Sequence, residues 1–414
     1  MIRTKNTNFV ILLLDAIVYA IALTFMDVNM VIPAFLDQIK APAWQIGLAS
    51  TLKQLGFLLP QFYLLTRIPR LKNQVKFIWT VYLLDRPQLL FFLALLTASP
   101  GSPYLPLIFL ICFGIFCTGE GIAQLPWMNL FGRTIRPELR GKLWGITQVI
   151  GGIGSLLGGL LITKMLNQAS YFPTNYLFIF GTGLIFLLSS LFFIRFAGNP
   201  ASQNQSYSIN FTQAIKTAWQ NSNFRIMLLV QVMVSADLLA LPYYIVMVKH
   251  RFPFLAPQIG TFVYLGIIGG ILGGFIWGYL SDHKGNRLTI ICIVLANIIV
   301  AGSFLGAQFI NNNTILPVIF WPAFIMVGMV GGGWLGFVNY MLELGDDQDK
   351  LSYITLNNTC MMAVVFLPIL GGILRNYYSD KLILSVVTAF MVAALFPALK
   401  LGEPRFHNLG STPL

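Results

Sequence analysis

Apolar windows long enough to cross a bilayer recur along almost the whole chain. A helix of about 20 apolar residues matches a hydrocarbon core roughly 30 Å thick, and in lipid a helix satisfies its own backbone hydrogen bonds. The chain has 57% hydrophobic and only 10% charged residues, too few charges to cover a water-facing surface. The sequence therefore predicts an all-α integral membrane protein. Its twelve transmembrane helices are expected near 9–35, 43–66, 76–98, 104–131, 143–165, 174–196, 223–248, 257–280, 288–310, 315–342, 351–374 and 381–401.

Basic residues predict the orientation of these helices. With a cytoplasmic N-terminus, 18 of the 26 Lys and Arg fall on the inner side, 6 on the outer side and 2 within spans. This bias is typical of cytoplasmic loops, so we expect a multi-pass protein of the plasma (inner) membrane with both termini cytoplasmic. The same distribution explains the net charge of +12 without nucleic acid. The expected partners are the lipid bilayer and a small-molecule substrate, with the chain acting as a monomer.

A polar segment divides the twelve helices into six and six. It lies at 197–222, and its part from 209 to 219 has a weak helical apolar period typical of a surface helix. "KLWGIT" (142–147) and "KLSYIT" (350–355) lie 208 residues apart and each begins a fifth helix. Parallel six-helix repeats of this kind build transporters with a site near the bilayer midplane. The predicted domains are a bundle at 1–196, the linker at 197–222, a bundle at 223–402 and a cytoplasmic tail at 403–414.

The loop "GYLSDHKGNR" (278–287) carries a family resemblance. It resembles the signature loop of the major facilitator superfamily of transporters, bacterial type. The matching positions are Gly278, Leu280, Asp282, Gly285 and Arg287. The resemblance implies two pseudo-symmetric six-helix bundles that work by alternating access, and it leaves the substrate open.

The resemblance also implies a cytoplasmic latch. Asp282 should meet the opposite half near Arg140, where the fifth helix begins. The alternative is a set of solvated loops that obey topology rules, as exposed charges often do. The equivalent loop of the first half is basic and should face an acidic segment, which gives a second latch with reversed charges. Its members are Arg67, Arg70, Asp346 and Asp347.

Ionisable residues within spans are the candidate functional groups, because charge inside a bilayer is costly. Asp27 and Lys53 lie 12 residues before and 14 residues after the centre of the first hairpin, so they share a depth and can form an ion pair. Asp85 is a second possible partner for Lys53. Removal of either member of such a pair would leave a buried charge uncompensated.

Three further acids are candidates for proton coupling or substrate binding. The resemblance implies that the first and fourth helices, with Asp15 and Glu120, line the central cavity. A carboxyl group without a full counter-charge at this depth favours its protonated form, as coupling requires. Arg86 is the possible partner of both, and a purely structural network is the alternative. Asp237 in the second half can recognise a cation, carry a proton, or simply accept a hydrogen bond from a nearby hydroxyl or amide.

Aromatic and amide side chains dominate the second half instead. They are candidates for the substrate cavity, although tryptophans in membrane proteins are more often interface anchors or packing residues. Pro242 predicts a distorted helix next to two of them. The set consists of Trp321, Trp334, Asn339, Tyr340, Tyr243, Tyr244 and Asn357.

These features predict a secondary active transporter of a small organic solute, coupled to protons, with the proton gradient as energy source and no cofactor. Gly145, Gly154, Gly158 and Gly159 partly resemble the exporter motif of drug/proton antiporters, which favours export. Close helix packing is the alternative reading of these glycines, and uptake of a nutrient is the alternative function. A membrane-embedded enzyme is disfavoured because the spans hold no metal-ligand spacing and no nucleophile with a base. A passive channel would not need so many acids at different depths.

Overall fold

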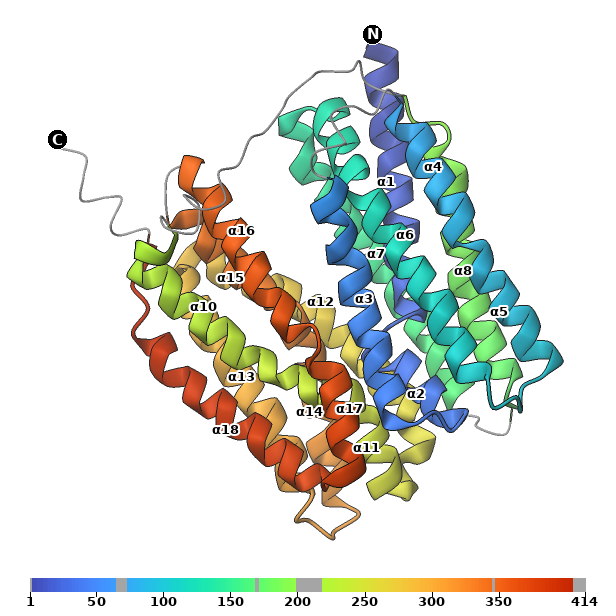
Figure 1. The fold of residues 1–414 in the computed structure, drawn as a ribbon, viewed down its shortest axis with the longest axis vertical. Helices are drawn as coiled ribbons and strands as arrows, with labels where there is room; N and C mark the ends of the chain where they lie inside the picture. The colour runs from blue at the N-terminus through green and yellow to red at the C-terminus, as the bar shows by residue number, and fades with distance from the viewer. Residues whose placement is uncertain (1, 65–72, 168–170, 199–217, 345–346, 405–414) are drawn as a thin grey trace. The chain divides into compact units, whose positions relative to one another are not determined.

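The computed structural model describes residues 2–64, 73–167, 171–198, 218–344 and 347–404, and these residues form helices and connecting turns without a strand (Figure 1). Eleven helical segments in the described part are long and apolar enough to cross a membrane. The helix over Ala43–Leu64, which carries Lys53 and several glutamines, is less apolar and completes the twelve. The number and order of the spans agree with the sequence prediction.

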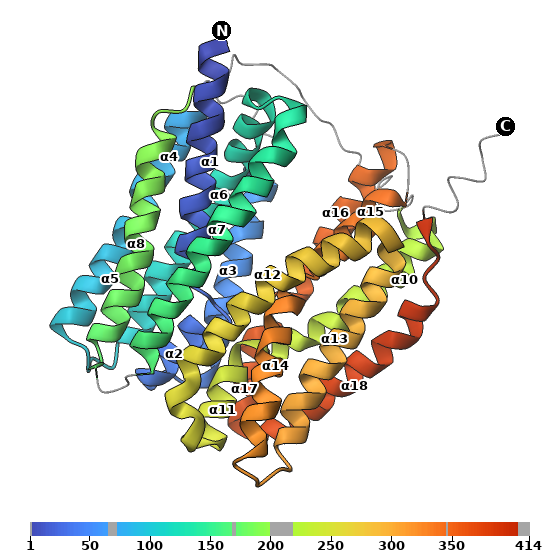
Figure 2. The same ribbon diagram turned by 180° about the vertical axis from the view of Figure 1, so that it is seen from behind.

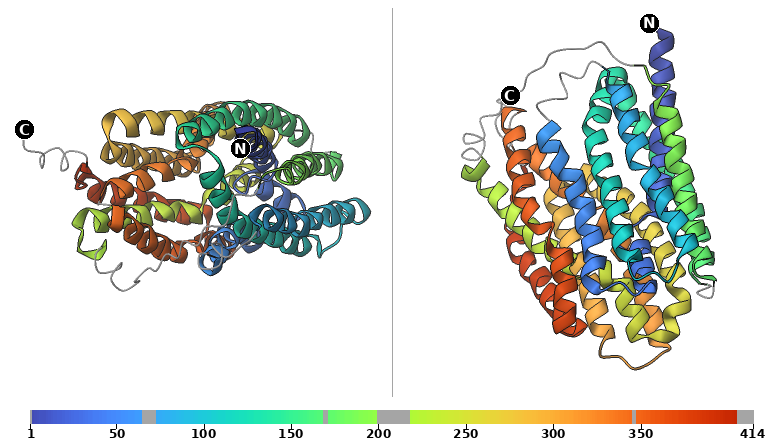
Figure 3. Two further views of the ribbon diagram at one scale, coloured as in Figure 1. Left: turned by 90° about the horizontal axis from the view of Figure 1, so that it is seen from above. Right: turned by 45° about the vertical axis from the view of Figure 1, so that its right-hand side comes forward.

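The chain forms two compact units. The first covers Met1–Tyr207 together with Val248–Tyr264, and the second covers Ser208–Met247 with Leu265–Leu414. The surface helix predicted at 209–219 falls mostly outside the described residues. In the first unit α1 packs along α7 and α8, and α6 packs along α3, α4 and α5 (Figures 1 and 3). Its helices are α1 (Ile2–Phe25), α2 (Val31–Gln38), α3 (Ala43–Leu64), α4 (Gln74–Asp85), α5 (Pro87–Ala98), α6 (Leu105–Thr134), α7 (Pro137–Leu166) and α8 (Thr174–Ile194).

The first predicted span is interrupted between α1 and α2. The Asp27 carboxylate oxygen Oδ1 accepts hydrogen bonds from the backbone N–H groups of Asn29 (3.0 Å) and Met30 (2.7 Å). Backbone N–H groups at a helix start need such acceptors. Below the break, α2 inserts the fully buried Phe35 among rings from three other helices, including Phe92 and Phe109. This aromatic cluster anchors α2 in the bundle.

Glycines bring α3 and α6 into backbone contact. A Cβ atom on Gly56 would meet the backbone of Cys117 and Thr118, and one on Gly121 would meet the carbonyl oxygen of Gly56. Small residues at a crossing allow such close approach in membrane bundles. The two helices therefore hold Lys53 and Glu120 on a shared, tightly fixed wall.

The helices of the second unit also pack side by side, with close contacts at glycines. Its α13 lies beside both α14 and α18, and α10 packs on α18 (Figure 2). Gly328 and Gly269 allow the backbones of α12 and α14 to touch. The helices that begin in or enter this unit are α10 (Ser222–Val234), the short 3₁₀ helices η3 (Ser235–Leu239) and η4 (Leu241–Tyr243), α11 (Tyr244–Arg251), α12 (Ile259–Lys284), α13 (Asn286–Ala307), α14 (Ile315–Gly331), α15 (Trp334–Glu343), α16 (Asp347–Val364), α17 (Leu367–Tyr377) and α18 (Asp380–Leu399). The short 3₁₀ helix η5 (Pro253–Gln258) lies in the segment that belongs to the first unit.

The predicted distortion at Pro242 is present. The seventh span changes from α-helix to 3₁₀ helix over Ser235–Leu239 and Leu241–Tyr243 before it resumes as α11. Proline removes a backbone donor and clashes with the preceding turn, which explains the break. Asp237 lies in this irregular stretch.

The segment 248–264 packs on the first unit although it follows the seventh span in the chain. Lys249 Nζ donates to Asp37 Oδ2 at 2.6 Å, and His250 Nε2 lies 2.6 Å from Asp37 Oδ1. Further along, Asn167 accepts from the backbone N–H of Gly260 at 3.0 Å. The basic cluster at 249–251, which counts against the predicted topology, thus meets an acid at the end of α2.

Candidate functional site

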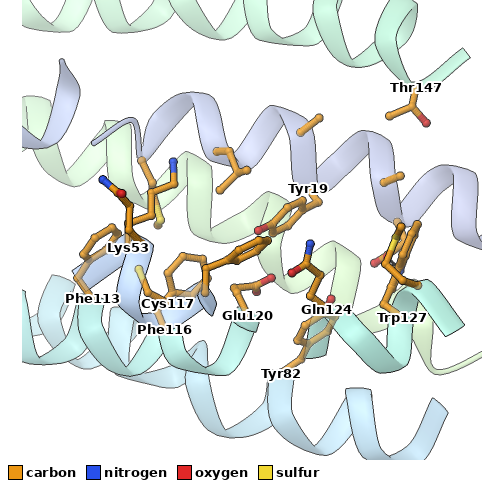
Figure 4. Close-up of a pocket in the computed structure, with 18 of the residues that line it drawn as sticks. Tyr19, Lys53, Tyr82, Phe113, Phe116, Cys117, Glu120, Gln124, Trp127 and Thr147 are labelled. Atoms are coloured by element: carbon orange, nitrogen blue, oxygen red, sulfur yellow. Dashed lines mark hydrogen bonds between the residues drawn. The ribbon is translucent and has the colours of Figure 1, made fainter. Parts of the chain in front are cut away.

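A cavity of about 530 Å³ lies within the first unit. Helices α1, α3, α4, α6 and α7 all contribute to its wall (Figure 4). Its volume is within the range of small-molecule sites. Its lining residues are Asp15, Ala16, Tyr19, Ala20, Leu23, Met26, Lys53, Gln54, Phe57, Tyr82, Phe113, Phe116, Cys117, Glu120, Gln124, Trp127, Met128, Trp144, Thr147 and Gln148.

Helical spacing explains why these side chains share one space. On α1 the lining runs from Asp15 to Leu23, which at 1.5 Å per residue corresponds to about 12 Å of helix. Met26 lines the cavity just after the end of this helix. On α6 the lining includes Phe113, Glu120 and Trp127, each seven residues apart and thus on one face. The cavity, called the slot below, has aromatic walls that carry charged and amide side chains.

Arg86 is the buried cation next to this slot. It stands at the break between α4 and α5, before Pro87, and its side chain is 0% exposed. Its Nη2 atom lies 3.3 Å from Glu120 Oε1, and its guanidinium carbon lies 3.6 Å from the centre of the Tyr82 ring. Nη1 donates to the carbonyl oxygen of Leu187 on α8. The predicted Arg86–Glu120 pair is therefore present.

Asp15 belongs to the same network. Its Oδ2 accepts a hydrogen bond from the indole N–H of Trp127 at 2.7 Å, and its Oδ1 accepts from the Ser190 hydroxyl. The Ser190 oxygen also accepts from Arg86 Nη2 at 3.4 Å. Ser190 thus connects Asp15 to the guanidinium that binds Glu120. Tyr19, from the next turn of α1, also lines the cavity, and its hydroxyl contributes to the electrostatic environment of Glu120.

Asp85 is a third carboxyl group beside Arg86. It is 2% exposed, and its oxygens have no hydrogen-bond partner in the described part of the chain. Arg86 Nε lies 4.0 Å from Asp85 Oδ1. A Cβ atom on Gly119 would overlap the Asp85 carboxyl group, so this glycine makes room for it. The Arg86 guanidinium therefore lies beside three carboxyl groups. It contacts those of Glu120 and Asp85 and reaches that of Asp15 through Ser190.

Lys53 marks another part of the slot, near Cys117. Its ammonium interacts electrostatically with the Asp27 carboxylate, although no direct ion pair within 4.0 Å joins them in the described residues. Asp85, the other candidate partner, pairs with Arg86 instead. Among the described residues Lys53 therefore forms no contact ion pair with either predicted partner, and its pairing with Asp27 stays a prediction.

Asp237 and its neighbours lie in the second unit. The Tyr244 hydroxyl donates to Asp237 Oδ1 at 2.6 Å, and the Tyr243 hydroxyl donates to the Pro368 carbonyl oxygen at 2.7 Å. Both tyrosines are almost fully buried. This arrangement matches the alternative in which Asp237 accepts a hydrogen bond from a neighbouring hydroxyl.

The remaining second-half candidates are scattered. Trp321 and Trp334 are 49% and 60% exposed. Tyr340 is buried, and its hydroxyl donates to the Gly402 carbonyl oxygen at 2.7 Å. Asn339 donates to the Ser281 hydroxyl at 3.1 Å. Asn357 is buried with a carbonyl oxygen that lacks a partner among the described residues.

The latch residues are described only in part. Gly285 has φ +92°, and a Cβ atom there would overlap Glu403, which accepts a hydrogen bond from the Arg287 backbone N–H at 3.0 Å. Arg287 also donates to the Leu399 carbonyl oxygen at 3.0 Å, Gly278 has open space around it, and Asp282 is exposed. Arg140 donates to the carbonyl oxygens of Gly132 and Ile135 in its own unit. Arg67, Arg70 and Asp346 lie outside the described residues, as does the side chain of Asp347.

Several residues of the slot and of its hydrogen-bond network were not predicted from the sequence, notably Tyr19, Tyr82, Gln124, Trp127 and Ser190. The spacing from Glu120 could have identified Gln124 and Trp127, which follow it by four and seven residues on the same helix. Ser190 carries no such signal because it reaches the network through the contact between α1 and α8. Among the described residues no group of three or more His, Cys, Asp or Glu side chains could hold a metal ion.

Comparison with known families settles the class of protein. The Major Facilitator Superfamily model matches residues 16–367, most of the chain. The chain belongs to the major facilitator superfamily. The resemblance of the 278–287 loop is thereby confirmed, and so are the twelve-helix, two-bundle fold and the class of a multi-pass membrane transporter rather than an enzyme.

Solved structures of the superfamily share the fold at low sequence identity. The nucleoside transporter NupG (D323A mutant) matches with a TM-score of 0.70 and 12% identity over 97% of this chain and 100% of that one. The xylose transporter XylE from E. coli, in a partially occluded inward-open conformation, matches with a TM-score of 0.65 and 12% identity over the whole of both chains. A bacterial homologue of the human lysosomal transporter Spinster has a TM-score of 0.58 and 14% identity, over 99% and 97% of the two chains. No curated protein matches the sequence.

Proposed function

We propose that this transporter moves a small organic solute in exchange for protons, with Glu120 as the coupling group. The observation that carries the proposal is the position of Glu120. Its carboxyl group lines the slot and contacts Arg86, which also serves Asp15 and Asp85.

Charge balance explains why this arrangement suits proton coupling. With all three carboxyl groups ionised, one guanidinium leaves two uncompensated negative charges in a buried site. Such charges are costly in a low-dielectric interior, and protonation removes the cost. The cluster therefore holds protons that it can release when another positive charge or donor approaches. Because Glu120 is the member that both faces the slot and contacts Arg86, a bound solute acts on it directly.

The other members of the network position Glu120. Arg86 is fixed by the Leu187 carbonyl oxygen and by stacking on Tyr82. Asp15 is fixed by Trp127 and Ser190. A solute that displaces Trp127 or Tyr19 would therefore also change how Asp15 and Glu120 share Arg86. Alternating access then carries the changed protonation state across the membrane.

Export is our proposal for the direction, but the glycines of α7 do not support it. Gly154 makes room for Ile21 of α1, and Gly158 makes room for Phe25. The glycine pattern thus accounts for close packing of α1 against α7 and needs no further role. Export follows instead from the proposed exchange, because protons that enter the cell down their gradient would drive the solute outward.

Uptake is the second candidate, because three amide side chains line the slot: Gln54, Gln124 and Gln148. Amides suit a solute rich in hydroxyl groups, and the similar structures include a nucleoside transporter and a xylose transporter. Monomeric action in the plasma (inner) membrane, with cytoplasmic termini and no cofactor, completes the proposed function.

Proton movement in proteoliposomes tests the proposal. A solute library is first screened by thermal stabilisation of the purified protein at two pH values, and the strongest binder is used as substrate. A pH-sensitive dye trapped inside should report proton movement that begins on solute addition and requires the protein. Solute movement with no proton movement, at any pH gradient, would refute proton coupling.

A further inference from the structure

The slot has more acidic than basic side chains, and this imbalance indicates which charge its substrate should carry. Four carboxyl groups lie in or beside it, those of Asp15, Asp27, Asp85 and Glu120, against two basic side chains. Lys53 and Asp27 offset each other, and Arg86 offsets one of the remaining three acids. Two carboxyl groups are therefore left without a basic partner.

Aromatic rings surround the acidic part of the slot. Phe116 precedes Glu120 by one turn of α6, Trp127 follows it by two turns, and Tyr19 reaches it from α1. Tyr82 already binds the Arg86 guanidinium on its ring, so this wall accepts a delocalised cation. The negative face of an aromatic ring attracts such cations, most strongly away from water.

We propose that the substrate is a lipophilic organic cation, bound by Glu120 and these rings in place of a proton. The proposal rests on the proposed function and specifies its substrate class. With a neutral solute both carboxyl groups would stay protonated in every state, whereas a cation can replace the proton on one of them. Binding of the cation then releases one proton from the site, and its departure returns one. Both the charge and the proton number balance in this exchange.

Other titratable groups share this environment. Asp15 and Tyr19 face Glu120 from α1, and Tyr82 and Asp85 face it from α4. Arg86 contacts it from the α4–α5 break, and Cys117 precedes it on α6. Arg86 stays charged at all working pH values, so the exchangeable proton belongs to the carboxyl groups.

The test uses two probe ions of matched size and opposite charge, tetraphenylphosphonium and tetraphenylborate, with the purified full-length protein. Trp127 and Trp144 line the slot, so tryptophan fluorescence can report binding. Tetraphenylphosphonium should bind, releasing about one proton per cation in weakly buffered solution. The affinity for tetraphenylphosphonium should fall as the pH is lowered, by up to about tenfold per pH unit in the range where the carboxyl groups are protonated. Tetraphenylborate should not compete for the site.

Variants separate this site from unspecific uptake of the probes. Glu120→Gln should weaken tetraphenylphosphonium binding at least tenfold and abolish proton release, while Glu120→Asp, which keeps the charge, should retain both in part. The matched control Asp380→Asn removes a carboxylate of the second unit that pairs with Arg375 and is not among the residues that line the slot, so it should behave like the wild type. Equal binding of the cation by wild type and Glu120→Gln, both with unchanged melting temperature, would overturn the inference.

Failure of the inference is distinguishable from failure of the proposed function. If uridine or xylose moves with protons through Glu120 and tetraphenylphosphonium does not bind, the substrate is neutral and only the cation inference is wrong. If tetraphenylphosphonium binds at Glu120 but no pH gradient drives its movement in proteoliposomes, the site binds cations and the proposed coupling is wrong.

Discussion

Replacement of Arg86 by methionine should destabilise the protein more than any other single removal of a charge. The variant loses the 3.3 Å ion pair to Glu120, the hydrogen bonds to Leu187 and Ser190 and the stacking on Tyr82. Removal of one partner from a buried ion pair costs about 3–5 kcal/mol, mainly because the other charge stays buried without compensation. Methionine fills most of the same volume, so the packing loss is small.

A double-mutant cycle isolates the electrostatic part. Arg86→Met combined with Glu120→Gln should recover about 2–3 kcal/mol relative to the sum of the single changes, as directly coupled residues do. The assay is denaturant-induced unfolding in mixed micelles, followed by tryptophan fluorescence. Arg375→Met is the matched control, because its pair with Asp380 is 2.8 Å long but partly exposed and should contribute at most about 1 kcal/mol. Equal losses for Arg86→Met and Arg375→Met, or strict additivity in the cycle, would refute the assigned network.

Three further predictions concern other charges. Lys53→Ala should lower the stability by about 3 kcal/mol, because the buried Asp27 charge loses its compensation. Lys53→Met with Asp27→Asn should restore folding in a thermal unfolding assay, since asparagine can still accept the backbone N–H groups. Failure of this rescue would exclude Asp27 as the partner of Lys53. Asp37→Asn and Lys249→Met should each lower stability by roughly 1 kcal/mol, and the double variant should lose no more than either alone, whereas fully additive losses would argue against their 2.6 Å contact. Asp282→Asn should increase cytoplasmic labelling of cysteines introduced in the slot, and unchanged labelling would leave the latch without support.

The spans and their grouping could be predicted from the sequence because bilayer thickness imposes a length and a hydrophobicity on every segment. The depth argument for Lys53 and Asp27 predicts only a shared height, and no ion pair within 4.0 Å joins the two side chains in the described residues. A helical hairpin fixes the relative height of its residues by counting alone. The break at Pro242 was likewise local, since proline interrupts a helix wherever it stands.

The network around Arg86 could be predicted only in outline. The sequence gives a basic residue and several acids at similar depth, but which carboxylate meets which donor depends on how helices rotate against one another. Ser190 illustrates the limit, because an ordinary serine on α8 becomes the bridge between Asp15 and Arg86 only through the packing of α8 on α1. The helix break after α1 is another case, since the role of Asp27 as acceptor for backbone N–H groups depends on that local geometry.

The most direct test of the central claim is transport by the Glu120→Gln variant. We expect it to lose accumulation driven by a pH gradient and to retain counterflow exchange of the same solute, because exchange requires no net change of protonation. Asp15→Asn and Asp237→Asn, measured in parallel, rank the other acids. A Glu120→Gln variant that still accumulates solute with the pH dependence of the wild type would contradict the assignment of Glu120 as the coupling group.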